Sequence, residues 1–209
     1  RFFRPIQELS QRYAVMQSAM ASAERLFQIL DTDERIASPD SPERLERPRG
    51  EIRFERVGFA YREGEPVIRD VSLTIRPGER IGIVGWTGSG KSTLIRLLTR
   101  LYEVQEGRVL IDGVDVRRMD PFALRRSIGV VLQDPFLFAG TIASNISLGD
   151  PEVSRERVEW AASVVHADRF VERLPQGFDT PVQEGGKNFS VGEKQLLCLT
   201  RALAFDPAI

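Results

Sequence analysis

The sequence lacks the features that would place it among disulfide-stabilised or membrane-spanning proteins. It has one cysteine, Cys198, so no disulfide can form within the chain, as is typical of a reducing compartment. No uninterrupted apolar run approaches the ~20 residues that a bilayer-crossing helix needs. We therefore expect a globular structure in which Cys198 packs in the core.

Charge of one sign is also not in excess. The chain has 29 Lys and Arg residues against 30 Asp and Glu residues, a formal net charge of −1. Nucleic-acid-binding domains carry a basic patch or a net positive charge, so we predict no nucleic-acid partner. A length of 209 residues, 42% of them hydrophobic, suits one globular domain with an appendage.

One motif is specific. Residues 85–92, Gly-Trp-Thr-Gly-Ser-Gly-Lys-Ser, fit the phosphate-binding pattern GxxxxGK[S/T] at every fixed position. An apolar run at 81–84 precedes the motif and a helix-like apolar pattern over 92–102 follows it, which makes a simple glycine-rich turn the weaker alternative. The predicted nucleotide-binding residues here are Gly85, Trp86, Thr87, Gly88, Ser89, Gly90, Lys91, Ser92 and Thr93.

The residue types of this motif match the chemistry of a nucleotide phosphate. Glycines allow successive backbone N–H groups to converge on the phosphates, and Lys91 supplies a mobile cation. The hydroxyl of Ser92 can ligate Mg²⁺, and the helix that follows directs its positive N-terminal end towards the anion. The sequence therefore predicts a nucleotide site with a magnesium ion.

The first 31 residues predict a long helix. Apolar or small residues recur alternately three and four positions apart, as in a heptad seam: Ile6, Leu9, Tyr13, Met16, Met20, Ala23, Phe27 and Leu30. Taken alone, this seam favours an ordinary packed helix or a homotypic coiled coil. Residues 32–50, rich in Asp, Glu, Pro and Arg, are predicted to form a linker.

From residue 51 onwards the pattern predicts an α/β domain. Strand-like runs occur at 51–61, 71–75, 81–84, 108–111 and 128–132. Strands of edge type before the phosphate motif, and strands alternating with a helix after it, indicate a nucleotide-binding core with an antiparallel β flank. Residues 152–174 are predicted to be helical, within a helical subdomain of about 135–200.

Three further segments, in this order around the phosphate motif, resemble ABC transporters of the exporter type. Residues 57–61 (Val-Gly-Phe-Ala-Tyr) resemble the family's aromatic loop, and residues 130–146 resemble its Q-loop segment. Residues 189–195 (Phe-Ser-Val-Gly-Glu-Lys-Gln) resemble its LSGGQ signature and are followed by a helical pattern. The resemblance extends over essentially the whole chain and implies a P-loop ABC-type ATPase fold that binds ATP and Mg²⁺.

The resemblance also implies roles for single residues. Tyr61 would stack on adenine, and Gln133 would reach Mg²⁺ and the attacking water, as a catalytic residue with Lys91. Ser190 and Gly192 would donate hydrogen bonds to a phosphate. Glu193 departs from the commonest signature, because it places an anion near the expected γ-phosphate.

The partners implied by the resemblance are a second nucleotide-binding domain and a membrane domain. The membrane domain would be contacted through the Gln133 loop and through Glu184, which lies in a segment resembling the exporter x-loop. Residues 1–31 would be the cytoplasmic end of the last transmembrane helix, so the domain would lie on the cytoplasmic side of the cell (inner) membrane. The whole protein would couple ATP hydrolysis to export, as a homodimer or a heterodimer.

Some family residues have no counterpart among the 209. The sequence stops before the strand that delivers the magnesium-associated aspartate and the catalytic glutamate, and before the switch histidine. His166, the one histidine, precedes the signature and is expected to have no catalytic role. We expect a chain that binds nucleotide weakly, is inactive by itself and has low stability, because its parallel sheet lacks strands.

Two alternatives belong to other classes. A soluble ABC-type ATPase of DNA repair or translation shares the phosphate motif and signature, but the exporter-type Q-loop segment and the seamed N-terminal helix argue against it. A nucleotide-binding module without enzymatic activity is favoured only if the natural protein ends at Ile209.

Overall fold

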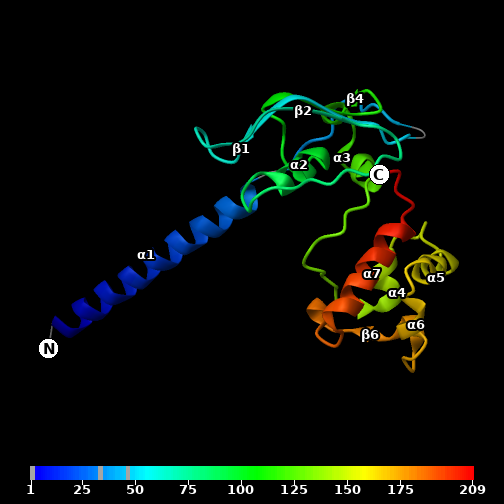
Figure 1. The fold of residues 1–209 in the computed structure, drawn as a ribbon. Helices are drawn as coiled ribbons and strands as arrows, with labels where there is room; N and C mark the ends of the chain where they lie inside the picture. Colours follow the sequence, from blue (N-terminus) through cyan, green and yellow to red (C-terminus); the bar gives the residue numbers. More distant parts are fainter. Residues whose placement is uncertain (1–2, 33–34, 46–47) are drawn as a thin grey trace. The chain divides into compact units, whose positions relative to one another are not determined.

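The computed structural model describes residues 3–32, 35–45 and 48–209 (Figure 1). The chain divides into two compact units, Arg1–Ile36 and Ala37–Ile209. The first unit contains one helix, and the second contains all other elements. The start of the predicted helix at 1–2, and parts of the predicted linker at 33–34 and 46–47, lie outside the described residues.

The first unit confirms the predicted N-terminal helix. α1 (Phe3–Asp31) begins with Pro5 in its first turn, where the missing N–H of proline costs no helical hydrogen bond. Seam side chains such as Ile6, Met16 and Met20 are exposed. Their packing against neighbouring membrane helices stays a prediction. Within the described ranges no helix combines the length and the apolar character needed to cross a bilayer.

The second unit contains an antiparallel sheet in the order β2-β1-β3-β4. Its strands are β1 (Ile52–Ala60), β2 (Pro66–Ile75), β3 (Glu106–Ile111) and β4 (Val114–Asp115). The predicted strands at 51–61, 71–75 and 108–111 are confirmed, and β2 begins earlier than predicted. In Figure 1, α2 (Lys91–Leu98) and α3 (Pro121–Arg126) lie on one side of this sheet.

A bulge in β1 keeps its apolar side chains on the core side. Phe54 pairs with Leu73 and Val57 with Val71, so β1 advances three residues while β2 advances two. Ile52, Phe54, Val57 and Phe59 are consequently all buried. Gly107 of β3 passes so close to the bulge that a Cβ there would lie 2.2 Å from the carbonyl oxygen of Glu55. Only glycine fits this crossing.

The main hydrophobic cluster lies between the sheet and the helices α2 and α3. Phe54, Val57 and Val109 from the sheet are buried together with Leu97 of α2 and Leu124 of α3. A 3₁₀ helix, η1 (Val116–Arg118), continues from β4 and adds Val116 to the same cluster. Helix α2, which begins in the phosphate motif, is therefore fixed to the sheet along its buried side.

Two predicted strands are wrong. Residues 81–84 and 128–132 have no strand structure, and Ile81, Val84 and Val131 are exposed. A strand needs a neighbour for its backbone N–H and C=O groups, and the described residues offer these runs almost none. The exception is a pair of backbone hydrogen bonds on either side of Ile128. The N–H of Gly129 donates to the carbonyl oxygen of Ile209 at 2.7 Å, and the N–H of Ile209 donates to the carbonyl oxygen of Ser127 at 3.2 Å.

Residues 140–204 form a second cluster of helices. These are α4 (Ile142–Ser147), α5 (Arg155–Val164), α6 (Asp168–Val171) and α7 (Val191–Ala204), with short strands β5 (Gly140–Thr141) and β6 (Pro181–Val182) and 3₁₀ helices η2 (Gly177–Asp179) and η3 (Glu184–Gly186). Leu137, Ile146, Ala161 and Leu197 are buried in their shared core. The helical prediction for 152–174 is confirmed over α5 and α6, whereas both ends of the range and the turn containing His166, whose φ is 59°, are not helical. Cys198 is buried, as predicted.

Candidate nucleotide site

The phosphate motif forms a tight loop that leads into α2. Gly90 is the N-terminal cap of α2 with φ 88° and ψ 5°, and Gly88 also has a positive φ of 85°. Side chains are disfavoured in this backbone conformation. A Cβ at Gly90 would in addition lie 2.6 Å from Cδ1 of Ile68 in β2. Gly88 is therefore required for its backbone conformation, and Gly90 for both its conformation and the lack of space for a side chain.

The side chain of Lys91 lies back across its own loop. Its Nζ donates to the carbonyl oxygens of Gly85 and Trp86, each at 2.8 Å. Both acceptors belong to the loop that is predicted to surround the phosphates, so the ammonium group is already at that loop. Trp86 is 90% exposed, so its indole has little contact with the described part of the chain.

Tyr61 is close to the first turn of α2, although the sequence separates the two by about 30 residues. Its hydroxyl lies 3.1 Å from Oγ1 of the buried Thr93 and accepts a hydrogen bond of 3.0 Å from Nη1 of Arg96. Its ring makes edge contacts with Phe59, at 4.9 Å between centroids, and with Tyr102, at 5.0 Å. The residue as a whole is 42% exposed. A free aromatic surface therefore stands beside the phosphate motif.

Gln133 is not held at the loop. It lies in an exposed segment without regular structure, and its side chain makes no hydrogen bond with the described part of the chain. The hydroxyl of Ser92 is likewise exposed and without a partner among the described residues. These two oxygen-bearing side chains suit Mg²⁺, which prefers oxygen ligands. The described ranges contain no cluster of three or more His, Cys, Asp or Glu residues that could bind a metal by itself.

The signature segment begins α7. Ser190 is the N-terminal cap, and its hydroxyl accepts from the N–H of Glu193 at 3.3 Å. Oε2 of Glu193 in turn accepts from both the N–H and the Oγ of Ser190, each at 2.8 Å. This capping box directs the Glu193 carboxylate towards Ser190. Gly192 has open space around its Cα, with no atom within 4 Å of a Cβ position. No hydrogen bond or ion pair among the described residues joins this segment to the phosphate loop.

Comparison with known proteins decides the family. A family model described as "ABC transporter" matches residues 68–209. The chain belongs to the ABC transporter family. The match includes the phosphate loop and the signature, and it confirms the predicted ABC-type ATPase fold. Membership of this family implies ATP binding.

Individual relatives match the ABC chain over its full length. "Fatty acid ABC transporter ATP-binding/permease protein" of Mycobacterium bovis is 47% identical over 209 residues, which are 100% of this chain and 33% of that protein. "Probable multidrug resistance ABC transporter ATP-binding/permease protein YheH" of Bacillus subtilis is 43% identical over 209 residues, 100% of this chain and 31% of its own length.

A solved structure gives the same result for the fold. "Structure of a bacterial Atm1-family ABC exporter with ATP bound" aligns with a TM-score of 0.81 at 37% identity, and covers 98% of this chain and 36% of that one. The chain thus spans about a third of the length of the relatives it matches. It corresponds to the ATP-binding part of exporter-type ABC proteins.

In this ABC chain, Arg201 joins the signature helix to the end of the Q-loop segment. Its Nε donates to the carbonyl oxygen of Asn145 at 2.8 Å and one Nη donates to that of Phe136 at 3.2 Å. The Asn145 side chain in turn bonds both backbone groups of Phe138 at 2.8 Å. Burial lowers the pKa of Arg201, which reflects the loss of water around its guanidinium.

Glu184 lies in the same region of the ABC chain. It is exposed at the start of η3, and the N–H of the next residue, Gly185, donates to the carbonyl oxygen of Leu137 at 3.0 Å. Nζ of Lys194 in α7 donates to the carbonyl oxygen of Gly185 at 3.4 Å. The predicted x-loop therefore contacts both the Q-loop segment and the signature helix, with the Glu184 side chain left open.

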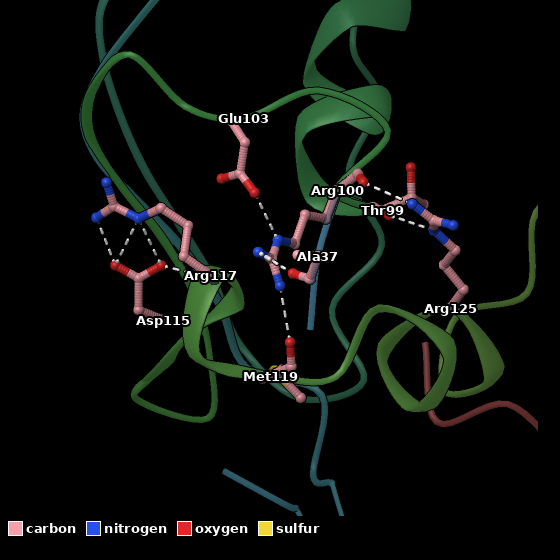
Figure 2. Close-up of polar contacts among 8 residues, drawn as sticks. All are labelled: Ala37, Thr99, Arg100, Glu103, Asp115, Arg117, Met119 and Arg125. Carbon is pink, nitrogen blue, oxygen red and sulfur yellow. Dashed lines mark hydrogen bonds and ion pairs between the residues drawn. The ribbon is translucent and has the colours of Figure 1, made fainter. Parts of the chain in front are cut away.

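The far end of α2 is held by two arginines (Figure 2). Arg100 is only 6% exposed, and it donates to Oε1 of Glu103 at 2.8 Å and to the carbonyl oxygens of Met119 at 2.8 Å and Ala37 at 3.2 Å. Arg125 donates to the carbonyl oxygens of Thr99 at 3.1 Å and Arg100 at 2.7 Å. Ala37, within the predicted linker, is thereby bonded to the end of the phosphate-loop helix.

No sequence motif indicated a role for these arginines or for Arg96. Arg96 lies one helical turn after Thr93, a spacing that was visible in the sequence. Its bond to Tyr61, however, joins residues 35 positions apart and depends on how β1 lies against α2. The acceptors of Arg100 and Arg201 are mostly backbone carbonyls. Every residue has one, so the sequence does not show which of them will accept a hydrogen bond.

Proposed function

We propose that the chain binds ATP with its phosphates at residues 85–92 and its adenine on Tyr61. The observation that carries this proposal is the contact of 3.1 Å between the Tyr61 hydroxyl and Oγ1 of Thr93, in the first turn of α2. An aromatic face accommodates a flat base without a directional partner, and the N-terminal end of a helix favours an anion. Surfaces suited to the two ends of the nucleotide are therefore adjacent.

For Mg²⁺ we propose Ser92 and Gln133 as the protein ligands. Both side chains are exposed and have no competing partner in the described chain. When bound, Mg²⁺ neutralises charge on the phosphates. No contact among the described residues holds the Gln133 segment against the phosphate loop. Gln133 would therefore either move towards that loop or bind the ion from its own segment.

For the whole protein we propose ATP hydrolysis coupled to export. Two such domains would pair head to tail, with each ATP between residues 85–92 of one and Ser190 and Gly192 of the other. Lys91, backbone N–H groups and the metal would stabilise the in-line attack of water on the γ-phosphate. The Gln133 loop and Glu184 would contact the membrane domain on the cytoplasmic side. No residue of this chain selects the exported substrate.

The 209-residue chain is expected to bind ATP without hydrolysing it. None of its residues matches the family's catalytic glutamate or switch histidine, so the water would lack its general base. Binding is measured with a fluorescent ATP analogue and turnover by phosphate release. Turnover above that of the Lys91→Ala variant would contradict the expectation, whereas lack of ATP binding would overturn the nucleotide site itself.

Glu193→Gln in the complete dimeric protein is expected to raise turnover roughly fivefold. The Glu193 carboxylate accepts hydrogen bonds from both the N–H and the hydroxyl of Ser190. A γ-phosphate that binds there would be repelled by this like charge, with an energy of about 1 kcal/mol. Glutamine retains an acceptor oxygen for the capping box but removes the charge. Steady-state ATPase kinetics measure the change, and Glu172→Gln is the matched control, because Glu172 is exposed and has no role in the proposed site. Equal turnover of Glu193→Gln and parent would show that Glu193 does not oppose the phosphate.

A further inference from the structure

Arg96 is an exposed cation with one described role. Its Nη1 donates to the Tyr61 hydroxyl at 3.0 Å, and its side chain makes no ion pair with any carboxylate in the described ranges. Thr93, three residues earlier on α2, contacts the same hydroxyl from the buried side. The phenol oxygen is therefore bound between two residues of one helix face.

These contacts restrict the Tyr61 ring. A tyrosine at the end of a strand can otherwise turn about χ1 and χ2. Here the hydroxyl is bonded at one end, while Phe59 and Tyr102 meet the ring at interplanar angles of 89° and 87°. The remaining 42% of the residue is open to solvent. The exposed face thus has one orientation relative to the loop of residues 85–92.

We propose that Arg96 is a positioning residue that fixes Tyr61 at a set distance from the phosphate loop. The inference rests on the proposed ATP site, and it deepens that proposal by naming what sets the spacing between its base and phosphate subsites. This spacing matters for a nucleoside triphosphate, because its flat base and its phosphates would contact the two subsites at the same time. Arg96 acts through the hydroxyl of Tyr61 and not through the phosphates.

The test uses ATPase kinetics of the full-length protein with Arg96→Ala, Tyr61→Phe and the double variant. Loss of one hydrogen bond to a charged group is expected to raise the KM for ATP about fivefold to tenfold, with kcat unchanged, because only uniform binding is lost. Arg96→Lys is expected to recover part of the loss. In the Tyr61→Phe background, Arg96→Ala is expected to add much less than in the parent, because the hydrogen bond is already absent and only the contact of Arg96 with the ring face, at 5.9 Å from Cζ to the centroid, is left.

Two further measurements show whether Arg96 affects the base subsite or the phosphate subsite. Inhibition by tripolyphosphate, which has no base, is expected to be unchanged in Arg96→Ala. Arg62→Ala is the control for charge, because Arg62 is an exposed neighbour of Tyr61 without a side-chain partner in the described chain. Equal weakening of tripolyphosphate and ATP, additive effects in the double variant, or no effect of Arg96→Ala would each overturn the inference. A parent protein that does not bind ATP would instead overturn the proposed function.

Discussion

Lys91→Ala is expected to lower the affinity for ATP at least a hundredfold and to leave the fold unchanged. Among the described residues, the ammonium group bonds only the carbonyl oxygens of Gly85 and Trp86, two acceptors in an open loop. Its removal leaves no buried group unpaired. With ATP bound, the same group would make charge-assisted bonds to phosphate oxygens, each contributing about 1.5–3 kcal/mol. Two such bonds account for a change of about a hundredfold or more.

Isothermal titration of ATP measures this loss, with circular dichroism as the check of the fold. Lys187→Ala is the matched control, because Lys187 is exposed and lies outside the proposed site. The expected result is a large loss for Lys91→Ala and none for Lys187→Ala. Similar affinities of both variants and the parent would show that residues 85–92 do not bind the phosphates.

Arg100→Ala is expected to destabilise the nucleotide-binding unit by about 3 kcal/mol or more. The substitution removes three hydrogen bonds and leaves the carbonyl oxygens of Met119 and Ala37 without their donor (Figure 2). Loss of a buried, hydrogen-bonded charge costs about 3–5 kcal/mol, and the carbonyl oxygen of the buried Met119, left without its donor, adds to that cost.

The change is measured by pulse proteolysis of the full-length protein in urea, which follows the unit without requiring a two-state melt of all domains. Arg118→Ala is the control, because Arg118 is 70% exposed and pairs with Glu43 at the surface. Exposed pairs of this kind contribute about 0–1 kcal/mol. An equal shift of the urea midpoint in both variants would contradict the importance of the buried contacts.

The predictions that the structure confirms came from patterns of residues close together in the chain. The phosphate motif predicted the loop and the start of α2, because glycine conformation and helix initiation depend on residues close in the chain. The helical seam predicted α1 for the same reason. The ABC fold followed from the order of several such motifs, and the comparisons confirm it.

Predictions that depended on distant partners were wrong or were not made. Residues 81–84 and 128–132 have strand-like composition, but a ladder needs a neighbouring strand, and composition does not supply one. The bulge that turns Val57 inward also depends on pairing with two other strands. The bond from Arg96 to Tyr61 and the carbonyl acceptors of Arg100 arise only after those strands and helices have packed. The role of Gln133 stays a prediction, because no contact places it.

The hydrogen bonds of Arg201 have a consequence for how this part of the chain can move. Since Arg201 bonds Phe136 and Asn145 to α7, residues 136–145 and the signature helix are expected to move as one rigid body. Any rotation of that body has to be absorbed by backbone outside it. The adjoining residues 130–134, which include Gln133, are exposed, have no regular secondary structure and make few backbone bonds. We expect them to act as the hinge, so that a displacement of Gln133 would rotate residues 136–145 and α7 together.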